Sequence, residues 1–559
     1  MEVSELMRTL LARRGVEKDE DVAAFLCPDY AVHTHSPLLL MGMEAAIARL
    51  FAAMSGGERI AIYGDFDCDG IPGAAVLYDT FQKIGYENVE VYIPHRDREG
   101  YGVHIAALDT LAGHGVSLVI TVDVGTTAIE PVRYAKSVGI DVIVTDHHEV
   151  KEVLPEAVAI INPKLGEYPF PDLCGAAVAW KLACALLIEG KKRGLENFTR
   201  IPDGWEKWLL DLVAIATIAD LVPLIGENRA LAFFGLTVLR KTPRPGIRAF
   251  CAGLRLRQHE LTEDDISFSF APRLNAASRM GDPEIAFKVL VSKDRNEAEG
   301  LVKHLEELNA SRKGVVGSIV REAKKRMETR FASDEQVVVL GDTAWKPSLL
   351  GLVANKLLDG RNGMVCLWGQ NGNGDLKGSC RTDGSLSMVD VFTRAEGAVE
   401  EFGGHHASGG FSVSKDQVHT LHEALARAAN ELERVEKETA ASYDALMSLS
   451  DMSWSFYCEI ARLSPFGMGN PKPVFRIRRT SVVSVKSFGK EKNHVEVMLA
   501  SCEGIASLRA FDFFRSESDF TARPAVGTGA DVIATLERDS FRGPGRIALR
   551  LVDILPQQD

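Results

Sequence analysis

The chain has 559 residues, of which 46% are hydrophobic, 25% charged and 7% aromatic. These values are close to the average of globular proteins and exclude a disordered or collagen-like chain, and the length suits about three or four domains. A net charge of −13 argues against coating nucleic acid by bulk charge, although a local basic groove is compatible with it. The nine cysteines form no CxxC pair, which favours reduced thiols over a disulfide framework or a zinc ribbon.

Signals for a membrane or for secretion are missing from the sequence. No run of eighteen apolar residues is present, and the start, Met1-Glu2-Val3-Ser4-Glu5, is acidic where a secretory signal would be basic and then apolar. We therefore expect a soluble cytoplasmic protein without membrane association.

The first 235 residues divide into a lead-in and an α/β domain. Residues 1–55 are predicted to form a short, mostly helical lead-in with breaks at Pro28 and Pro37. From residue 59 short apolar strands alternate with helical segments, the pattern of a doubly wound parallel sheet, so residues 56–235 are predicted to be α/β. The expected strands cover residues 60–63, 89–93, 118–122, 142–144 and 158–161, and helices are expected at 74–84 and 105–111.

The rest of the chain is predicted to form three further parts. Residues 236–330 are a connecting helical region, in which 283–330 has the composition and spacing of one long helix joining two lobes. Residues 331–440 are a second α/β lobe, and residues 441–559 are short alternating strands that suggest a small β-barrel. The expected elements are strands at 336–340, 364–368, 495–499, 532–536 and 546–552 and helices at 351–358 and 415–437.

Three carboxylates at alternate positions directly follow the first expected strand. They are Asp65, Asp67 and Asp69, and a helix is predicted to follow them. In open α/β sheets, ligand chemistry lies just beyond the carboxyl ends of the strands, so this placement suits a metal site. The alternatives are a solvated Asp-rich turn or a calcium loop, but Val76 stands where an EF-hand carries its twelfth-position Glu.

Two more strands end in ionisable residues. Asp123 ends the strand at 118–122, and Asp146-His147-His148 ends the next. Each has an ordinary explanation, a helix cap for the Asp and surface polarity for the His pair, but their coincidence on one rim of the sheet favours a site. Asp220 lies in an otherwise apolar segment, where burial is costly unless a cation is near, and is the natural further ligand.

This ligand set predicts both the metal and the reaction. Oxygen ligands with one or two imidazoles suit Mn²⁺ or Mg²⁺ better than a structural zinc. So many acidic ligands favour two ions roughly 3.5–4 Å apart, the arrangement that activates a water and stabilises the leaving oxygen in phosphoryl transfer. The expected reaction is hydrolysis of a phosphoester or phosphoanhydride.

These residues resemble the DHH phosphoesterase superfamily, and later motifs narrow the resemblance to the RecJ family of single-strand-specific 5′→3′ DNA exonucleases. The resemblance runs in order from about residue 59 to 475. The motifs that carry it are Pro-His-Arg-Asp-Arg-Glu-Gly-Tyr-Gly (94–102), Arg-Leu-Asn-Ala-Ala-Ser-Arg-Met (273–280), Gly-Ser-Cys-Arg (378–381), Phe-Gly-Gly-His-His-Ala-Ser-Gly-Gly-Phe (402–411) and Pro-Phe-Gly-Met-Gly-Asn-Pro-Lys-Pro (465–473).

The resemblance implies a fold and a site. The fold is two α/β lobes, of DHH and DHHA1-like type, joined by a long helix and followed by an OB-like β-barrel. Two Mn²⁺ or Mg²⁺ ions would be bridged by Asp123, with His147 and His148 completing the catalytic set and His148 contacting the scissile phosphate. One ion would take Asp67, and the other would take Asp69, His147 and Asp220.

One ligand position departs from the superfamily. Smaller DHH phosphatases carry a His four residues before the position of Asp67, and here that residue is Tyr63. Asp65 is therefore an expected metal ligand whose share relative to Asp67 and Asp69 stays open. Asp146 is expected to orient its neighbours rather than to bind the metal.

The resemblance also implies DNA contacts. The planar guanidinium of Arg matches phosphate geometry, although the ordinary alternative for any single Arg is a surface salt bridge. Lys346 stands where relatives usually carry the His of Trp-His-x-Gly, so substrate contacts from that turn stay open. The expected DNA-binding residues are Arg96, His148, Arg279, Ser379, Arg381, His405 and His406.

The predicted barrel has local positive charge, and the alternative to DNA contact is a structural barrel whose charges are solvated. The charges are Lys486, Lys490, Lys492, Arg509, Arg515, Arg538, Arg542 and Arg546. The family implies a 5′→3′ exonuclease of DNA repair and recombination, acting as a monomer on single-stranded DNA with a free 5′ end, with a single-strand-binding protein and a helicase as partners.

Two other functions remain open. One is a DHH-type oligonucleotide or cyclic-dinucleotide phosphodiesterase, against which the barrel and the motif at 94–102 argue. The other is an inactive DNA-binding scaffold, which would have no need for the buried acidic and histidine residues. No GxxxxGK[ST] motif is present, which argues against an ATP-driven motor.

Overall fold

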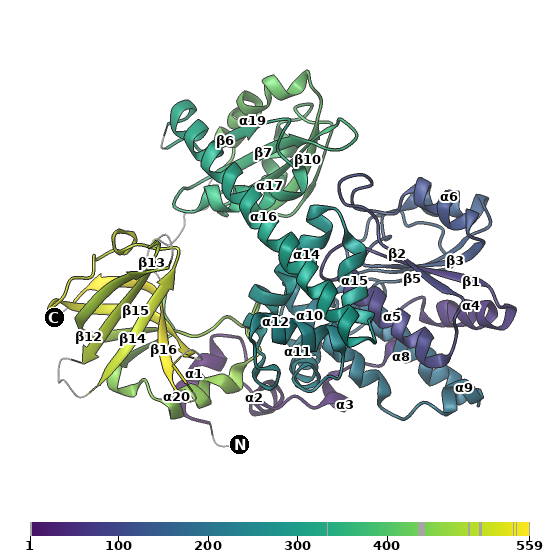
Figure 1. Cartoon of the computed structure of the whole chain (residues 1–559), viewed down its shortest axis with the longest axis horizontal. Coiled ribbons are helices and arrows are strands. Elements are labelled where there is room, and N and C mark those ends of the chain that lie inside the picture. Colours follow the sequence, from purple (N-terminus) through teal and green to yellow (C-terminus); the bar gives the residue numbers. More distant parts are fainter. Residues whose placement is uncertain are drawn as a thin grey trace. The chain divides into compact units, whose positions relative to one another are not determined.

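The computed structural model describes residues 3–332, 334–433, 442–489, 492–501, 506–539, 542–543 and 545–557. The chain divides into two compact units, one made of Met1–Thr34, Pro223–Phe233 and Glu438–Asp559 and the other of His35–Val222 and Phe234–Lys437 (Figure 1). The predicted lead-in at 1–55 is thus shared between the units, and residues 223–233 belong with the C-terminal part of the chain.

The larger unit begins with a parallel five-stranded sheet in the order β2-β1-β3-β4-β5, which confirms the predicted α/β class. Its strands are β1 (Arg59–Gly64), β2 (Val89–Tyr92), β3 (Val116–Val122), β4 (Asp141–Thr145) and β5 (Ala159–Ile161). The strand order reverses between β1 and β3, and such a switch point is where open α/β sheets bind ligands.

Helices cover this sheet. They are α4 (Met43–Gly56), α5 (Gly70–Ile84), α6 (Ile105–Gly113), α7 (Ile129–Ser137) and α8 (Gly175–Lys192), while α9 (Glu196–Thr199) packs on α8 and α10 (Leu210–Ala219) packs on α5 and α8. At Gly73 in α5 an added Cβ would lie 2.6 Å from Val122 of β3 and 2.9 Å from the Cα of Ala176 in α8. This close approach brings the start of α8 to the ends of β1 and β3.

The predicted single helix at 283–330 is two helices. α15 (Pro283–Val291) ends before Ser292, and α16 (Arg295–Arg330) begins after Asp294. The Asp294 carboxylate accepts a hydrogen bond from the backbone NH of Glu297 at 2.7 Å, so it caps a new helix. The helices that precede this pair are α11 (Gly226–Leu239), α12 (Pro245–Leu254), α13 (Glu263–Asp265) and α14 (Ala271–Met280).

The second α/β lobe has a mixed sheet in the order β6-β7-β8-β10-β9, in which only β6 and β7 are parallel. Its elements are β6 (Val337–Gly341), α17 (Pro347–Leu358), β7 (Met364–Gln370), β8 (Leu376–Thr382), α18 (Met388–Arg394), β9 (Glu401–Gly404), β10 (Ser408–Val413) and α19 (Leu421–Asn430). The helix expected at 415–437 is shorter, since only α19 forms within it and residues 434–437 lie outside the described part of the chain.

The smaller unit contains the predicted barrel, in the order β11-β12-β13-β14-β16-β15, and β15 pairs back with β12 to close it. The strands are β11 (Ala445–Ser448), β12 (Val474–Phe488), β13 (His494–Ser501), β14 (Ser507–Phe513), β15 (Gly529–Arg538) and β16 (Ile547–Pro556). Its hydrophobic core includes Met7 and Leu10 of α1 (Glu5–Ala12) and Phe25 of α2 (Asp19–Leu26). The N-terminal helices are therefore part of the barrel unit.

The motif at 465–473 has a structural role in this unit. The Asn470 carboxamide donates hydrogen bonds of 2.8 Å to the carbonyls of Leu463 and Pro465 and accepts one of 2.8 Å from Arg14. Arg229 is buried and donates to the carbonyls of Phe25 and Leu463 at 2.8 Å each. These bonds join the N-terminal helices, residues 223–233 and the segment that leads into β12.

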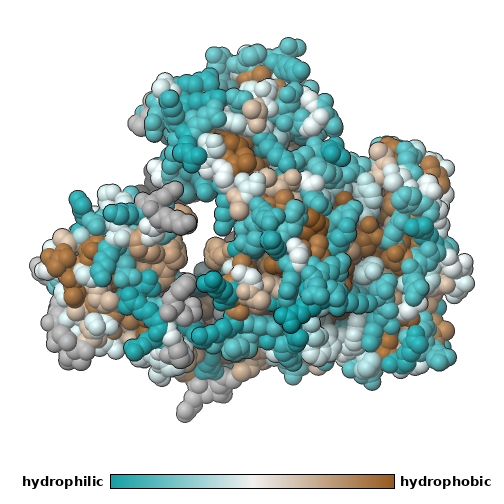
Figure 2. All heavy atoms as spheres, in the orientation of Figure 1, coloured by the Kyte–Doolittle hydropathy of each residue, from teal (hydrophilic) through white to brown (hydrophobic). Residues whose placement is uncertain are grey.

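The visible face of the molecule is mostly hydrophilic, with scattered apolar patches (Figure 2). Within the described residues, no single helix has both the length and the apolar composition to cross a membrane. The bent pair Tyr30–Leu39 and Met43–Gly56 meets the criterion only when its two helices, 71° apart, are taken together.

Candidate active site

Every metal ligand expected from the sequence lies at one rim of the parallel sheet. Three groups of side chains have ligand atoms within 4.8 Å of one another. They are Asp65, Asp67 and Asp123; Asp69, His147 and Asp220; and Asp123, His147 and His148. Asp123 belongs to two groups and His147 to two, so the groups form one continuous site at the switch point between β1 and β3.

Short hydrogen bonds fix the loop after β1. The Asp69 carboxylate accepts from the backbone NH groups of Gly175 at 2.6 Å and Ala176 at 2.7 Å, which are unsatisfied donors at the start of α8. Asp67 accepts from the NH of Asp69 at 2.8 Å. A Cβ at Gly70 would lie 2.5 Å from the Asp65 carbonyl oxygen, so only glycine fits in this turn.

Asp123 lies in a constrained position. Its φ is 62°, a left-handed conformation that Asp tolerates better than most residues. A Cβ at Gly175 would lie 2.6 Å from the Asp123 Cβ, so the glycine at the start of α8 makes room for this side chain. The Asp123 side chain is buried, and its Oδ1 accepts no hydrogen bond.

His147 places one ring nitrogen among three carboxylates. Its Nε2 lies 3.2 Å from Asp123 Oδ1 and 3.7 Å from both Asp69 Oδ2 and Asp220 Oδ2. Burial lowers the pKa of His147, against the opposing charge of Asp69. A neutral imidazole is the form that binds a metal.

Asp146 and His148 form a separate pair beside the ligands. His148 Nδ1 lies 2.7 Å from Asp146 Oδ1, and Asp146 also accepts from the NH groups of His147 at 2.8 Å and Thr126 at 2.9 Å. Burial opposes ionisation of Asp146, but the bonds from His148 and Thr126 outweigh it and lower its pKa below the usual range. Asp146 in turn raises the pKa of His148 despite burial. This geometry suits the predicted orienting role of Asp146.

The electrostatics of the rim fit bound cations. Burial raises the pKa of Asp65, Asp69 and Asp123, and it raises that of Asp220 to about 9, with neighbouring carboxylates adding to the effect. Asp65 Oδ1, like Asp123 Oδ1, is buried without a hydrogen-bond donor. Buried carboxylates in such number are costly unless a cation neutralises them, and carboxylates with one imidazole fit Mn²⁺ or Mg²⁺.

Two tyrosines, Tyr63 and Tyr101, form hydrogen bonds that bear on the site. The Tyr63 hydroxyl donates to the Gly102 carbonyl at 3.0 Å, and the ring stacks on Tyr92, so Tyr63 is engaged away from the acidic loop. Tyr101 was not predicted as a site residue, yet its hydroxyl lies 3.1 Å from His148 Nδ1 and 3.3 Å from the Asp123 carbonyl oxygen. Its place between two glycines of the motif at 94–102 was the available signal.

The three expected DNA-binding arginines lie close together. Burial lowers the pKa of Arg279 to about 9, and the positive charges of Arg96, Arg312 and Arg381 act in the same direction. Within the described residues, Arg96, Arg279 and Arg381 form no ion pair with a carboxylate. Clustered cations without carboxylate partners are suited to bind an anion such as phosphate.

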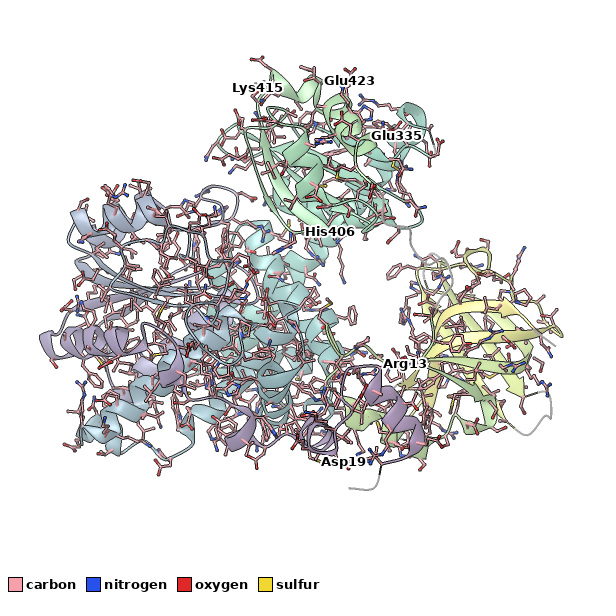
Figure 3. All side chains as sticks on the ribbon, turned by 180° about the vertical axis from the view of Figure 1, so that it is seen from behind. Arg13, Asp19, Glu335, His406, Lys415 and Glu423 are labelled. Carbon is pink, nitrogen blue, oxygen red and sulfur yellow. The ribbon has the colours of Figure 1, made fainter. Side chains whose placement is uncertain are left out.

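The remaining expected DNA contacts lie in the second lobe. Ser379 lies on β8, two residues before Arg381, and its register partner is Gly410 on β10. Glu149 directly follows His148. Lys164 lowers the pKa of Glu149 and His405 adds to this shift, so His405 of the second lobe lies near Glu149. His406 is exposed and lies at the opposite end of the lobe from Lys415 and Glu423 (Figure 3).

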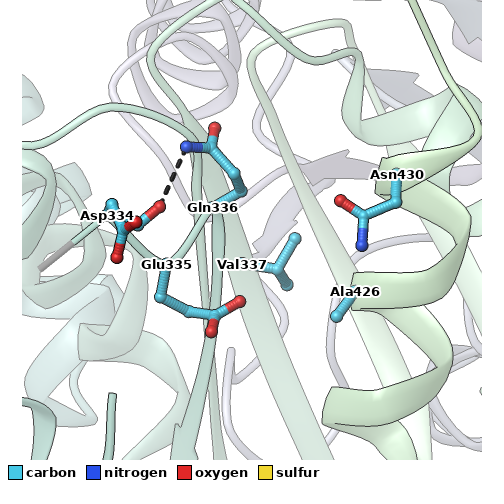
Figure 4. Close-up of a pocket in the computed structure, with 6 residues that line it drawn as sticks. All are labelled: Asp334, Glu335, Gln336, Val337, Ala426 and Asn430. Carbon is cyan, nitrogen blue, oxygen red and sulfur yellow. Dashed lines mark hydrogen bonds between the residues drawn. The ribbon is translucent and has the colours of Figure 1, made fainter. Parts of the chain in front are cut away.

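A separate pocket of ≈ 210 Å³ opens beside β6 and α19 (Figure 4). Its lining is Asp334, Glu335, Gln336, Val337, Ala426 and Asn430, and the Gln336 amide donates to the Asp334 carbonyl at 3.0 Å. None of the expected site residues lines this pocket.

Comparison with known proteins agrees with this architecture. Family models match at residues 59–217 (DHH family, N-terminal domain), 334–433 (DHHA1 domain) and 443–553 (RecJ OB domain). With the acidic rim on a parallel sheet, these matches define a DHH phosphoesterase with a DHHA1 lobe and an OB barrel.

The relatives narrow the class. The chain is 32% identical over 574 residues to the single-stranded-DNA-specific exonuclease RecJ of Escherichia coli (strain K12), covering 99% of this chain and 96% of that protein. It is 35% identical over 503 residues to RecJ of Bacillus subtilis (strain 168), covering 89% of this chain but 62% of that protein. The chain belongs to the RecJ family of single-stranded-DNA-specific exonucleases.

A solved structure agrees. The crystal structure of RecJ from Thermus thermophilus in complex with Mn²⁺ matches with a TM-score of 0.80 at 26% identity, covering 100% of this chain and 76% of that one. A Mg²⁺ complex of the same protein matches with a TM-score of 0.74 at 25% identity.

Proposed function

We propose that this chain is a Mn²⁺- or Mg²⁺-dependent exonuclease that degrades single-stranded DNA from its 5′ end. The observation that carries the proposal is the rim where Asp65 Oδ1 and Asp123 Oδ1 are buried without hydrogen-bond donors among further carboxylates and His147. Relatives named as single-stranded-DNA-specific exonucleases, and a solved relative with Mn²⁺ and with Mg²⁺, support the substrate and the ions.

The rim offers ligands for two ions. Asp65, Asp67 and Asp123 would hold one, and Asp69, His147, Asp220 and Asp123 would hold the other. When bound, such ions activate a water and stabilise the charge that develops on the phosphate and the leaving oxygen.

The residues beside the ligands would handle the scissile phosphate. Asp146 raises the pKa of His148, so His148 is suited to donate a hydrogen bond to a phosphate oxygen. Tyr101 hydrogen-bonds to the same ring and would hold it in the orientation that faces the phosphate. Because the Asp146 carboxylate accepts from Nδ1, the protonated ring can donate a second hydrogen bond from Nε2 to the substrate.

The arginine cluster supports 5′ polarity. Arg96, Arg279 and Arg381 would bind the terminal phosphate of the strand, together with the Ser379 hydroxyl. The charge of Asp67 acts on Arg279, so the cluster lies near the metal ligands. A strand whose 5′ phosphate stops at the cluster would present its next phosphodiester bond to the ions.

The barrel is suited to hold DNA through aromatic side chains rather than through the cations expected from the sequence. Three of its predicted cations are paired: Arg509 contacts Glu496 at 2.6 Å, Arg542 contacts Glu496 at 3.4 Å and Arg515 contacts Asp512 at 3.5 Å. Lys490 lies outside the described residues. The more suitable surface is a cluster of rings at one end of the barrel, which we call the aromatic cluster: Phe488, His494, Phe511, Phe513 and Phe514.

The aromatic cluster suits base stacking. Its rings lie 4.9–5.8 Å apart between centroids, Phe514 is 79% exposed and Arg550 lies 4.5 Å from the centre of the Phe513 ring. Arg550 is itself paired with Asp512 at 2.9 Å, so the support for DNA holding is the exposed rings, on which proteins stack the bases of single strands.

The cellular setting follows from the substrate and the thiols. The eight described cysteines are free thiols, which suits a reducing, cytoplasmic compartment. Single strands in cells must be opened from duplex and kept apart, so a helicase and a single-strand-binding protein are the expected partners. We expect the chain to act as a monomer.

Digestion of labelled DNA tests the proposal. Single strands and blunt duplexes, each labelled at the 5′ or the 3′ end, are incubated with Mn²⁺, with Mg²⁺ or with a chelator. We expect metal-dependent loss of the 5′ label before the 3′ label, on single strands. Release that starts at the 3′ end, or that persists with the chelator, would contradict the proposal, and no degradation at all would favour an inactive scaffold.

A further inference from the structure

An ion pair joins the two α/β lobes of the larger unit. Lys346 Nζ lies 2.8 Å from Asp97 Oδ2. Lys346 directly precedes α17 in the second lobe, and Asp97 lies in the loop after β2 of the first lobe. The side chains are 33% and 13% exposed, so the pair is only partly screened by water.

Two neighbouring contacts join the same surfaces. The Asn373 amide donates to the Arg98 carbonyl at 3.0 Å, one residue after Asp97. The Ser348 hydroxyl donates to the Arg279 carbonyl at 3.1 Å, while the Arg279 guanidinium donates to the Ser348 carbonyl at 2.5 Å. The start of α17 therefore contacts both the loop of Asp97 and the end of α14, and Lys346 supplies the ion pair.

This junction lies beside the arginine cluster. Arg96, next to Asp97, has its guanidinium 4.6 Å from the centre of the Phe66 ring, between Asp65 and Asp67 in sequence. Burial lowers the pKa of Arg381, and the positive charge of Arg96 lowers it further. Arginines from the two lobes therefore lie close together. A phosphate bound by both arginines requires the lobes to keep this arrangement.

We propose that the Lys346–Asp97 pair is a latch that holds the two lobes around a bound strand and so sets how many nucleotides are removed in one binding event. Both are positioning residues, because neither belongs to the metal ligands or to the arginine cluster. The inference rests on the proposed exonuclease function, and it assigns to Lys346 a role in retaining substrate.

Charge reversal tests the latch. The variants are Lys346→Glu, Asp97→Lys and the double exchange, with Lys415→Glu as a matched control on an exposed lysine at the far end of the same lobe (Figure 3). The readouts are the number of nucleotides removed from a 3′-labelled strand in the presence of excess unlabelled trap DNA, the single-turnover rate of the first cleavage, and the melting temperature.

We expect each single reversal to lower the nucleotides removed per binding event by about fivefold, the upper end of the range for exposed ion pairs, because reversal replaces the attraction with repulsion. The double exchange should return to within about twofold of the original protein, since it restores the opposite charges with their places exchanged. The rate of the first cleavage should be unchanged in all variants. The Lys415→Glu variant should match the original protein in every readout.

The outcomes separate the latch from the function on which it rests. Single variants that match the original protein, or a double exchange no better than the worse single variant, would overturn the latch. Loss of first-cleavage rate or of melting temperature that the double exchange fails to restore would assign the pair to the fold and overturn it equally. If the unmodified protein degrades no DNA, the proposed function fails instead.

Discussion

At the scale of single residues, Asp123 is the centre of the site. It combines a left-handed backbone, a buried oxygen without a hydrogen bond and membership of two ligand groups. A residue that costs stability in these ways is retained where function needs it. The glycine at position 175 accommodates it, so the surrounding fold is adapted to this carboxylate.

Asp123→Asn should abolish hydrolysis while the fold stays intact. Asn keeps the shape and tolerates φ > 0, but it removes the charge shared between the ions, and we expect kcat to fall by about 10³-fold or more. Melting of the metal-free protein should be unchanged or higher, because one of the repelling buried charges is gone. Asp203→Asn, at a fully exposed carboxylate, is the control. Turnover near that of the original protein would contradict the bridging role.

The pKa of Asp220, raised to about 9 in the metal-free protein, predicts a pH dependence. An unfolded Asp has a pKa of about 3.9, so between these values the folded state binds more protons than the unfolded state. The metal-free protein should therefore lose stability as pH rises through this window, and Mn²⁺ should bind more tightly as pH rises towards 9.

Calorimetry in two buffers of different ionisation enthalpy measures the proton release that accompanies Mn²⁺ binding. We expect release at pH 7 that decreases in Asp220→Asn. Mn²⁺ affinity that is independent of pH between 6 and 9 would show that these carboxylates are already ionised without metal.

The ligands could be predicted from the sequence because each directly follows an apolar strand or lies in an apolar segment. The contacts of Tyr101 and Tyr63 could not, because they depend on side chains that only the folded chain brings near. The ion pair of Arg509 with Glu496 could not be predicted from the sequence either, because it depends on the register of β13 with β14.

At the scale of elements, helix starts and strand ends build the site. The first turn of α8 binds Asp69, and the same turn makes room for Asp123. The α/β class and the strands of the first sheet were predictable from apolar periodicity, whereas β8 to β12 and β14 were not predicted. The break between α15 and α16 was missed because Ser292 and Asp294 read as ordinary polar positions within a long helical pattern, whereas the Asp294 cap begins a new helix.

Phe514→Ala should weaken binding of single-stranded DNA without lowering kcat at saturation. The ring is 79% exposed, so its removal costs little stability, while a stacked base contributes about 1–3 kcal/mol, which is roughly 5- to 150-fold in affinity. Val526→Ala, at another exposed apolar residue of the barrel, is the control. Unchanged affinity measured by fluorescence anisotropy would show that the aromatic cluster does not bind DNA.

Deleting the chain from residue 474 would not isolate the role of the barrel in DNA binding. The barrel core includes Met7, Leu10 and Phe25, so removal of β12 to β16 would uncover the apolar faces of α1 and α2. We expect the truncated protein to lose the cooperative melting of this unit. A truncated chain that still melts as two cooperative units would contradict the shared core.

At the scale of the whole molecule, the larger unit brings arginines of its two lobes close together. Arg96 and Arg381 come from different lobes, and the start of α17 contacts the first lobe through Lys346 and α14 through Ser348. The order of domains was predictable from motifs and composition. The grouping of residues 1–34 and 223–233 with the barrel was not, because it depends on bonds such as those of Arg229, which join segments distant in the sequence.

This arrangement predicts a preference for single strands. A paired end would keep its 5′ phosphate from reaching the arginine cluster, and misplacement of a reacting bond by about 1 Å costs about 10²-fold in rate. Initial rates on a blunt duplex and on the same strand alone should differ by at least that factor. Equal rates would contradict the placement of the 5′ end between the lobes.

The central claim is a two-ion site at the switch point of the parallel sheet, and anomalous diffraction from crystals soaked in Mn²⁺ tests it most directly. We predict two peaks roughly 3.5–4 Å apart, one beside Asp65 and Asp67 and one beside Asp69, His147 and Asp220, with Asp123 between them. A single peak, or peaks away from Asp123, would contradict the account.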